Sequence, residues 1–131
     1  MSLLINNNHM SKKILIIEDE TALLYALQSQ LAVSGYQPLA ADDGEKALKI
    51  LEKEKPNAII LDIILPKMDG WAFFKKIKSG EKTKNIPVII VSNLSDEASQ
   101  ARGIELGAKD YLVKTNYTIS ELVDKIKELT K

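Results

Sequence analysis

The 131-residue chain has no cysteine and a single histidine. The lack of cysteine excludes disulfides, thiolate metal sites and cysteine nucleophiles, and it fits a reducing cytoplasm, which is the location we expect. The one histidine, His9, falls in a leader-like segment and is therefore excluded from catalysis. No apolar run approaches the length of a membrane span, and the first ten residues lack the apolar core of a secretion signal.

An excess of charge of one sign is also missing, because 18 Lys and Arg residues balance 18 Asp and Glu residues. The overall charge therefore gives no attraction to a polyanion, and we expect neither direct nucleic-acid binding by this domain nor a membrane partner. The length suits one domain. Residues 1–10 are interpreted as a leader added to the native chain or as a flexible arm, and residues 11–131 as the folded domain.

Apolar runs alternate with helical patterns along the chain, which indicates repeated strand-helix units around a parallel sheet. The predicted strands are 13–17, 36–40, 58–61, 88–91 and 109–113. The first, third and fourth are apolar throughout, as strands covered on both faces are, and belong in the middle of the sheet. The expected fold is α/β, a doubly wound five-stranded parallel sheet in the order 2-1-3-4-5 with five helices, as in flavodoxin-like proteins.

Helices are expected to begin near Leu23, Asp42, Trp71, Asp96 and Thr118. Thr118 has Glu121 three residues later, which is the spacing of a capping box. The fourth helix, about 96–106, is the least apolar, and the residues predicted to face the sheet are Ala98, Ala101, Ile104 and Leu106. In the third helix, the aromatic residues expected to be core and surface-packing residues, rather than a cofactor-binding group, are Trp71, Phe73 and Phe74.

Carboxylates follow two of the predicted central strands. Asp62 comes directly after the run 58–61, and Glu18 and Asp19 come directly after the run 14–17. If these strands are neighbours, the three acids meet at the carboxyl edge, at the reversal of strand order where ligands bind in such folds. Like charges this close require a cation or a phosphoryl transfer to account for them.

Two further polar groups reach the same edge. Strand 88–91 ends in Ser92, and strand 109–113 ends in Lys114, so a hydroxyl and an ammonium join the acids. A set of oxygen ligands without histidine or cysteine favours magnesium over zinc. A lysine beside such an ion can neutralise one carboxylate and later pair with a phosphoryl oxygen.

With these residues in place, the chain resembles the receiver domain of two-component response regulators over residues 12–131. The matching motifs are IIEDE (16–20), LDIILPKMDG (61–70), PVIIVS (87–92) and GAKDYLVK (107–114). Each motif alone is modestly specific, whereas five functional positions in order at the ends of strands form a strong signal.

The resemblance implies that Asp62 is the phosphoacceptor for a histidine kinase or phosphotransfer protein. It further implies that Asp19 and Asp62 bind Mg²⁺ together with the backbone carbonyl of Ile64, and that Glu18 acts mainly through water. Lys114 and the Ser92 hydroxyl would hold the phosphoryl oxygens. Such a domain is not an enzyme on other substrates, because it promotes only its own phosphorylation and dephosphorylation.

The resemblance also implies an output. Ser92 and Tyr111 would act as a switch that changes the face formed by helix 96–106, strand 109–113 and the last helix, for a downstream protein target that the sequence does not identify. The domain would be a monomer or a phosphorylation-dependent dimer. Ile64 and Leu94 occupy the positions that tune dephosphorylation in this family, and neither can orient water, so slow self-dephosphorylation is expected.

Two positions depart from the family pattern. Thr115 follows Lys114 where the family usually has a cis-proline, which puts the direction of the lysine in question. Glu18 replaces a common aspartate, so the affinity for magnesium does not follow from the resemblance.

Three other functions compete with this interpretation. One is a phosphorylation-independent, receiver-like interaction module, which the intact acids, Ser92 and Lys114 disfavour. Another is a phosphohydrolase of the haloacid dehalogenase type, which needs a second acid where Ile64 stands. A flavodoxin would need a phosphate-binding loop where residues 18–20 place three acids.

Overall fold

The computed structural model describes residues 11–131, in which five parallel strands form one sheet in the order β2-β1-β3-β4-β5. The strands are β1 (Lys13–Ile17), β2 (Gln37–Ala41), β3 (Ala58–Leu61), β4 (Val88–Ser92) and β5 (Asp110–Val113). The predicted order is therefore confirmed, and each strand lies within one residue of its expected bounds. The proposed leader, residues 1–10, lies outside the described residues.

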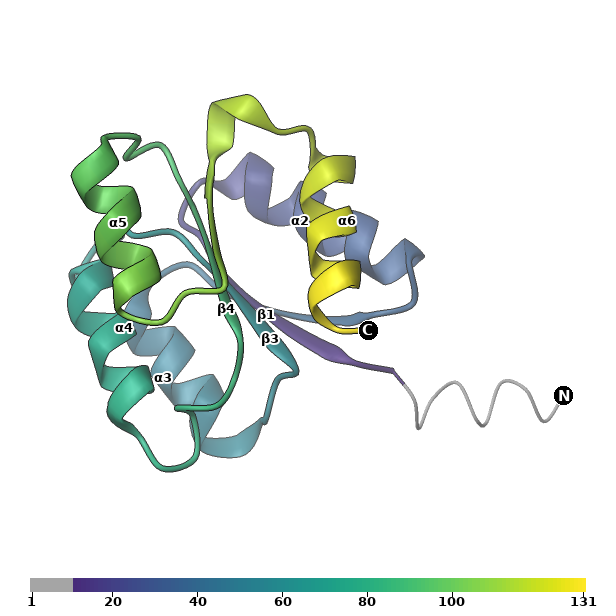
Figure 1. Cartoon of the computed structure of the whole chain (residues 1–131). Coiled ribbons are helices and arrows are strands. Elements are labelled where there is room, and N and C mark those ends of the chain that lie inside the picture. Colours follow the sequence, from purple (N-terminus) through teal and green to yellow (C-terminus); the bar gives the residue numbers. More distant parts are fainter. Residues whose placement is uncertain (1–10) are drawn as a thin grey trace, which may run out of the picture.

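Helices cover both faces of the sheet (Figure 1). They are α2 (Thr21–Val33), α3 (Gly44–Lys53), α4 (Gly70–Ser79), α5 (Glu97–Glu105) and α6 (Ile119–Leu129), with a short 3₁₀ helix η1 (Lys114–Asn116) after β5. Helices α2 and α6 lie on one face, and α3, α4 and α5 lie on the other. None of the helices in residues 11–131 has the length and apolarity that crossing a bilayer requires.

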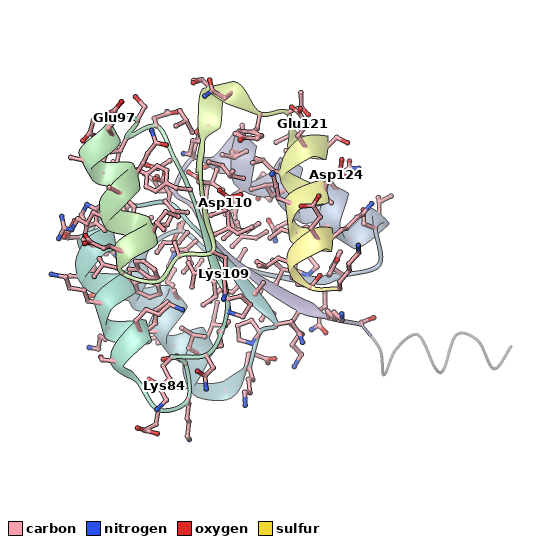
Figure 2. All side chains as sticks on the ribbon, in the orientation of Figure 1. Lys84, Glu97, Lys109, Asp110, Glu121 and Asp124 are labelled. Carbon is pink, nitrogen blue, oxygen red and sulfur yellow. The ribbon has the colours of Figure 1, made fainter. Side chains whose placement is uncertain are left out.

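The central strands are buried on both faces, as their continuous apolar sequence predicts. In β1, Leu15 and Ile17 pack into the core beneath α3 and α4, and Ile14 and Ile16 pack into the core beneath α2 and α6. Figure 2 shows side chains filling both spaces between the sheet and its helices, with charged residues such as Glu97 and Glu121 on the outside. The sheet is thus a rigid support for the residues at its edge.

Helix starts follow the predicted chemistry with one correction. Thr118 and Glu121 form the expected capping box on α6. At α3, however, the cap is Asp43, whose carboxylate accepts from the Lys46 backbone N–H at 2.8 Å. Asp42, the expected start, instead forms an exposed ion pair with the side chain of Lys46 at 2.8 Å. Two adjacent aspartates offered the same capping chemistry, so the sequence pattern placed the start one residue early.

The predicted inward face of α5 is wrong at three of its four residues, and only Leu106, which is half-buried, packs against the core as expected. Ala98 and Ala101 are exposed, and Ile104 keeps 51% of its surface in solvent. The residue that α5 buries is Gly103, where an added Cβ would lie 2.8 Å from both Ile90 Cδ1 and Tyr111 Cδ2. The helix therefore rotates its smallest residue onto the sheet, because only a glycine permits this close approach.

Helix α4 agrees with the prediction. Phe73 and Phe74 are fully buried, and Trp71 is 7% exposed. The guanidinium of Arg102, from α5, lies 4.3 Å from the centre of the Trp71 ring. This cation–π contact joins α5 to α4.

Candidate phosphoacceptor site

Register places the site residues side by side. Ile17 of β1 pairs with Leu61 of β3, so Glu18 and Asp62 leave the sheet at the same level. The Asp62 backbone N–H still donates to Ile17 O at 3.0 Å, which holds this first loop residue against β1. Because parallel strands end at one edge, these two carboxylates are delivered together.

The same register argument brings in the hydroxyl and the ammonium. Ser92 at the end of β4 pairs with Val113 of β5, and Lys114 follows directly. Ser92 is fully buried, and the Lys114 side chain is 11% exposed. The predicted site residues from β1, β3, β4 and β5 therefore share one edge of the sheet.

Three carboxylates lie close enough to share one cation. Glu18, Asp19 and Asp62 each offer an oxygen, and these oxygens all lie within 4.8 Å of one another. Glu18 and Asp62 are 2% and 3% exposed, whereas Asp19 is exposed. Two buried acids and one acid open to solvent are thus grouped at the expected point.

Lys114 neutralises part of this charge. Its Nζ lies 2.7 Å from Asp62 Oδ2 and 2.9 Å from Glu18 Oε1. The peptide after Lys114 is trans, since no cis bond occurs in residues 11–131, and the chain turns into η1 there. The threonine at position 115 therefore does not prevent the lysine from reaching the acids.

The pKa values of the two partners reflect burial and pairing. Burial raises the pKa of Glu18, and the Lys114 ammonium opposes that effect only in part. For Lys114, burial lowers the pKa, but the hydrogen bonds to Asp62 and Glu18 outweigh it, so the net shift is upward. The Lys114 side chain is therefore protonated and positively charged at neutral pH.

Both oxygens of Asp62 have partners. Oδ1 accepts from the Ile64 backbone N–H at 3.0 Å, and Oδ2 accepts from Lys114. The loop that carries Ile64 closes tightly, because Gly70 N donates to Ile63 O at 3.1 Å. An added Cβ at Gly70 would lie 2.2 Å from that oxygen, so a glycine is required there.

Ser92 and Tyr111 meet through a backbone segment between them. The Leu94 N–H donates to Ser92 Oγ at 3.2 Å, and the Tyr111 hydroxyl donates to Leu94 O at 2.5 Å. Tyr111 is 7% exposed, so its ring occupies an inward position. Burial raises the pKa of Tyr111, with a smaller opposing effect from Ser92.

Sequence reasoning missed two features of the site. One is the peptide link through Leu94, which no residue-type pattern reveals because it uses backbone atoms. The other is Glu20, whose Oε1 lies 3.4 Å from Lys114 Nζ. The signal for Glu20 was present, since it is a third acid directly after Glu18 and Asp19.

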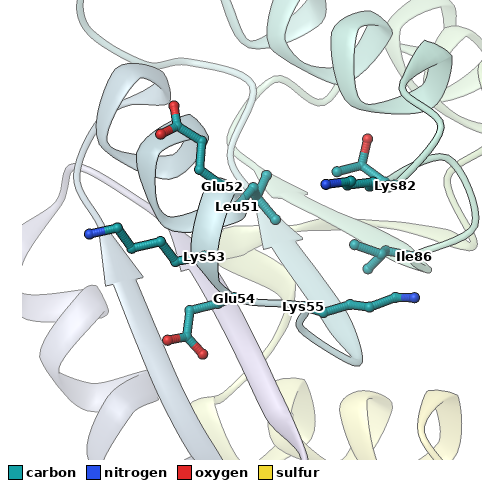
Figure 3. Close-up of a pocket in the computed structure, with 8 residues that line it drawn as sticks. Leu51, Glu52, Lys53, Glu54, Lys55, Lys82 and Ile86 are labelled. Carbon is teal, nitrogen blue, oxygen red and sulfur yellow. The ribbon is translucent and has the colours of Figure 1, made fainter.

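A hollow elsewhere in the chain does not compete with this site. A cavity of about 330 Å³ lies beside the end of α3 and the loop before β4, and Leu51 and Ile86 form part of its lining. Figure 3 shows Lys53 and Lys55 pointing in different directions there, so the ammonium groups do not converge on a ligand.

The carboxylate group fits a hard divalent cation. Its donors are oxygens, and histidine and cysteine are absent from residues 11–131. Magnesium prefers a small number of carboxylate ligands and retains several waters, which the exposed side of Asp19 allows. The donor set is thus suited to magnesium rather than zinc.

Comparison with known proteins agrees with this geometry. Residues 14–127 match the response regulator receiver domain family. The chain is 41% identical over 105 residues to the alkaline phosphatase synthesis transcriptional regulatory protein PhoP of Bacillus subtilis, covering 80% of this chain and 43% of that protein. It therefore spans less than half the length of this curated relative.

Solved structures give the same result. The signal receiver domain of a signal transduction histidine kinase from Syntrophus aciditrophicus is 32% identical, with a TM-score of 0.81 over 92% of this chain and 90% of that one. The Mn²⁺-bound form of response regulator Rcp1 is 30% identical, with a TM-score of 0.75 over 91% of this chain and 89% of that one. With its fold, its edge of acids and lysine, and these similarities, the chain belongs to the response regulator receiver domain family.

Proposed function

We propose that Asp62 accepts a phosphoryl group from a histidine kinase or phosphotransfer protein, in a reaction that requires Mg²⁺. One observation carries the proposal: a buried aspartate at the end of a central strand contacts, at 2.7 Å, a lysine whose side chain is 11% exposed, inside a group of three carboxylates. Receiver domains typically undergo this reaction, so the family and the geometry support the same assignment.

The metal would be held by Asp19, Asp62 and the backbone carbonyl of Ile64, with Glu18 acting through water. A bound divalent cation would neutralise the phosphoryl oxygens as charge develops on them. The Mn²⁺-bound form of Rcp1, a structural relative, supports a divalent ion in this fold. The Ile64 side chain, 54% exposed, lies outside the core at this rim.

The chain's own groups account for the transfer. An Asp62 oxygen forms the new O–P bond as the P–N bond to the donor imidazole breaks. The other ring nitrogen of that imidazole carries a proton taken from water, so the ring leaves as neutral imidazole. Asp62 Oδ2 is paired with Lys114, so this ammonium must give up part of its contact with Asp62 and turn to a phosphoryl oxygen. Since the transition state is loose and anionic, positioning and positive charge supply most of the acceleration.

The output would begin at Ser92. When its hydroxyl swings inward to donate to the new phosphoryl group, its oxygen moves away from the Leu94 N–H that now donates to it, and the Leu94 carbonyl oxygen accepts from the Tyr111 hydroxyl. Movement of the Leu94 backbone would therefore be transmitted to the Tyr111 ring and to α5 beside it. The face formed by α5, β5 and α6 would then change its affinity for a downstream protein.

The test is phosphorylation by acetyl phosphate with Mg²⁺, followed by mass spectrometry. We expect an acid-stable, base-labile gain of one phosphoryl group on Asp62, lost in Asp62→Asn and without Mg²⁺. The matched control is Asp69→Asn, since Asp69 lies in the same loop, is exposed and forms no side-chain cap at α4. It should be phosphorylated like the wild type.

The same experiment tests the second candidate, a receiver-like interaction module that works without phosphate. No mass gain in a folded wild-type chain, with acetyl phosphate and Mg²⁺ in excess, would favour this module over the phosphoacceptor.

A further inference from the structure

The ammonium of Lys114 has a third acidic partner, Glu20. Its Oε1 lies 3.4 Å from Lys114 Nζ, beyond the contacts to Asp62 and Glu18. The three partners differ in burial: the side chains of Glu18 and Asp62 are 3% and 4% exposed, and that of Glu20 is 59% exposed. Glu20 is therefore the partner that can leave the lysine for water at little cost.

The backbone keeps Glu20 at this position. Its N–H donates to Glu18 Oε2 at 2.9 Å, and its carbonyl accepts from Leu24 N at 3.0 Å in the first turn of α2. Residue 20 is thus anchored both to the buried acid and to the start of a helix. The Glu20 backbone therefore stays within side-chain reach of Lys114 while β1 and α2 stay in place, even when the carboxylate turns to water.

Charge around the lysine is strongly unbalanced. Three carboxylates, those of Glu18, Glu20 and Asp62, contact one ammonium group, and an Asp19 oxygen lies within 4.8 Å of oxygens of Glu18 and Asp62. A phosphodonor is itself an anion. A divalent cation offsets part of this charge, but the carboxylate of Glu20 remains on the exposed side from which a donor approaches. Like charge at a site entrance lowers the rate of encounter, most strongly at low salt.

We propose that Glu20 is a positioning residue that competes with the phosphoryl group for Lys114 and thereby slows phosphorylation of Asp62. This inference rests on the proposed function of the site. Glu20 holds the ammonium in the unphosphorylated state and repels anionic donors, while its negative charge strengthens binding of the cation. The residue would therefore act in opposite directions on metal affinity and on phosphorylation rate.

The test compares three chains: the wild type, Glu20→Gln and the control Glu105→Gln. Glu105 is exposed near the far end of α5, and its substitution changes the net charge by the same amount. Phosphorylation by acetyl phosphate is measured at saturating Mg²⁺, at low and high salt. Mg²⁺ binding to the unphosphorylated chain is measured by calorimetry, and the Lys114 ammonium is followed by NMR.

For Glu20→Gln we expect phosphorylation about two- to fivefold faster at low salt, which corresponds to the interaction free energy of one exposed ion pair. The gain should shrink at high salt, and Mg²⁺ should bind about twofold more weakly, because one screened charge is removed. The Lys114 signal should shift in this variant and stay in place in Glu105→Gln. A purely structural role for Glu20 would not produce faster phosphorylation together with weaker metal binding.

A rate for Glu20→Gln equal to or below that of the wild type at saturating Mg²⁺ would overturn the proposal, as would equal changes in Glu105→Gln. These results differ from failure of the proposed function, in which the wild type itself gains no phosphoryl group. If the wild type gains no phosphoryl group, the NMR signal of Lys114 still tests the contact between Glu20 and Lys114. An unshifted signal in Glu20→Gln would reject that contact, and a shifted signal would support it.

Discussion

Gly103→Ala is a sensitive test of how α5 sits on the sheet. In most helix interiors this substitution is favourable by about 0.5–1 kcal/mol, because alanine is the better helix former. Here the new methyl group would lie 2.8 Å from Ile90 Cδ1 and 2.8 Å from Tyr111 Cδ2. Ile90 Cδ1 is the end of a flexible side chain, but the Tyr111 ring is held by the bond from its hydroxyl to Leu94 O.

The Tyr111 ring should therefore decide whether Gly103→Ala raises or lowers the free energy of unfolding. Overpacking of a core typically costs about 1–3 kcal/mol, which exceeds the helical gain, so Gly103→Ala should lower the free energy of unfolding by about 0.5–2 kcal/mol. In a Tyr111→Ala background the ring is gone and the flexible end of Ile90 can move aside, so the same substitution should instead stabilise by about 0.5–1 kcal/mol. The coupling energy of the double-mutant cycle is then about 1–3 kcal/mol.

Urea denaturation of the four chains measures these values, provided that the m-values agree. Gly44→Ala serves as the comparison, because its methyl group would lie 3.1 Å from Met68 Sδ and 3.2 Å from Met68 Cβ, contacts that a small shift relieves, so this substitution should be close to neutral. A Gly103→Ala chain more stable than the wild type, or an equal effect in both backgrounds, would refute the packing described for α5.

Three further predictions address the loop, the tyrosine and the stacked arginine. Ile64→Asn combined with Leu94→Glu should speed loss of the phosphoryl group at least about tenfold, because polar side chains can orient an attacking water. The decay rate of the phosphorylated chain measures this effect, and an unchanged lifetime would contradict shielding of the phosphoryl group by Ile64 and Leu94. Burial raises the pKa of Tyr111 above its ordinary 10.0, so the folded state favours the neutral hydroxyl. The hydroxyl's contribution to the free energy of unfolding is therefore complete below pH 10 and is lost as the pH rises through the raised pKa. The stability difference between wild type and Tyr111→Phe, about 1 kcal/mol at neutral pH, should therefore shrink above pH 10 in urea titrations, and a difference that persists there would argue against burial of the hydroxyl. Arg102→Ala should cost about 0.5–1 kcal/mol and shift emission of Trp71, the only tryptophan, to longer wavelength; an unchanged spectrum would count against the stack.

The acids, the hydroxyl and the lysine were predictable because topology alone places them. A residue that ends or directly follows a strand of a parallel sheet lies at the carboxyl edge whatever its side chain does. Ser92 ends β4, and Glu18, Asp62 and Lys114 directly follow their strands, so all four meet this condition. Continuous apolar runs then identified β1, β3 and β4 as central. Strand order and edge position together bring the four residues close without any knowledge of rotamers.

Side-chain direction and backbone links were not predictable in this way. The contact of Glu20 with Lys114 depends on how an exposed side chain crosses the rim, and the Leu94 link uses peptide groups that every residue has. The inward position of Tyr111 is one of the rotamers open to a strand residue, and packing against Gly103 selects it. In each case a tertiary contact makes the choice, and sequence patterns carry no record of it.

Helix α5 shows where apolar periodicity fails, and it leads to a last prediction. Periodicity counts apolar side chains, but α5 buries Gly103, which has none, and leaves Ile104 exposed. Helix α6 instead buries Leu122, Val123 and Ile126. Because local opening costs less where less apolar surface is buried, amide hydrogens of α5 should exchange with solvent at least about tenfold faster than those of α6. Native-state exchange measured by NMR tests this directly, and equal protection of the two helices would mean that the Arg102 stack and the Tyr111 bond hold α5 as firmly as a full apolar face would.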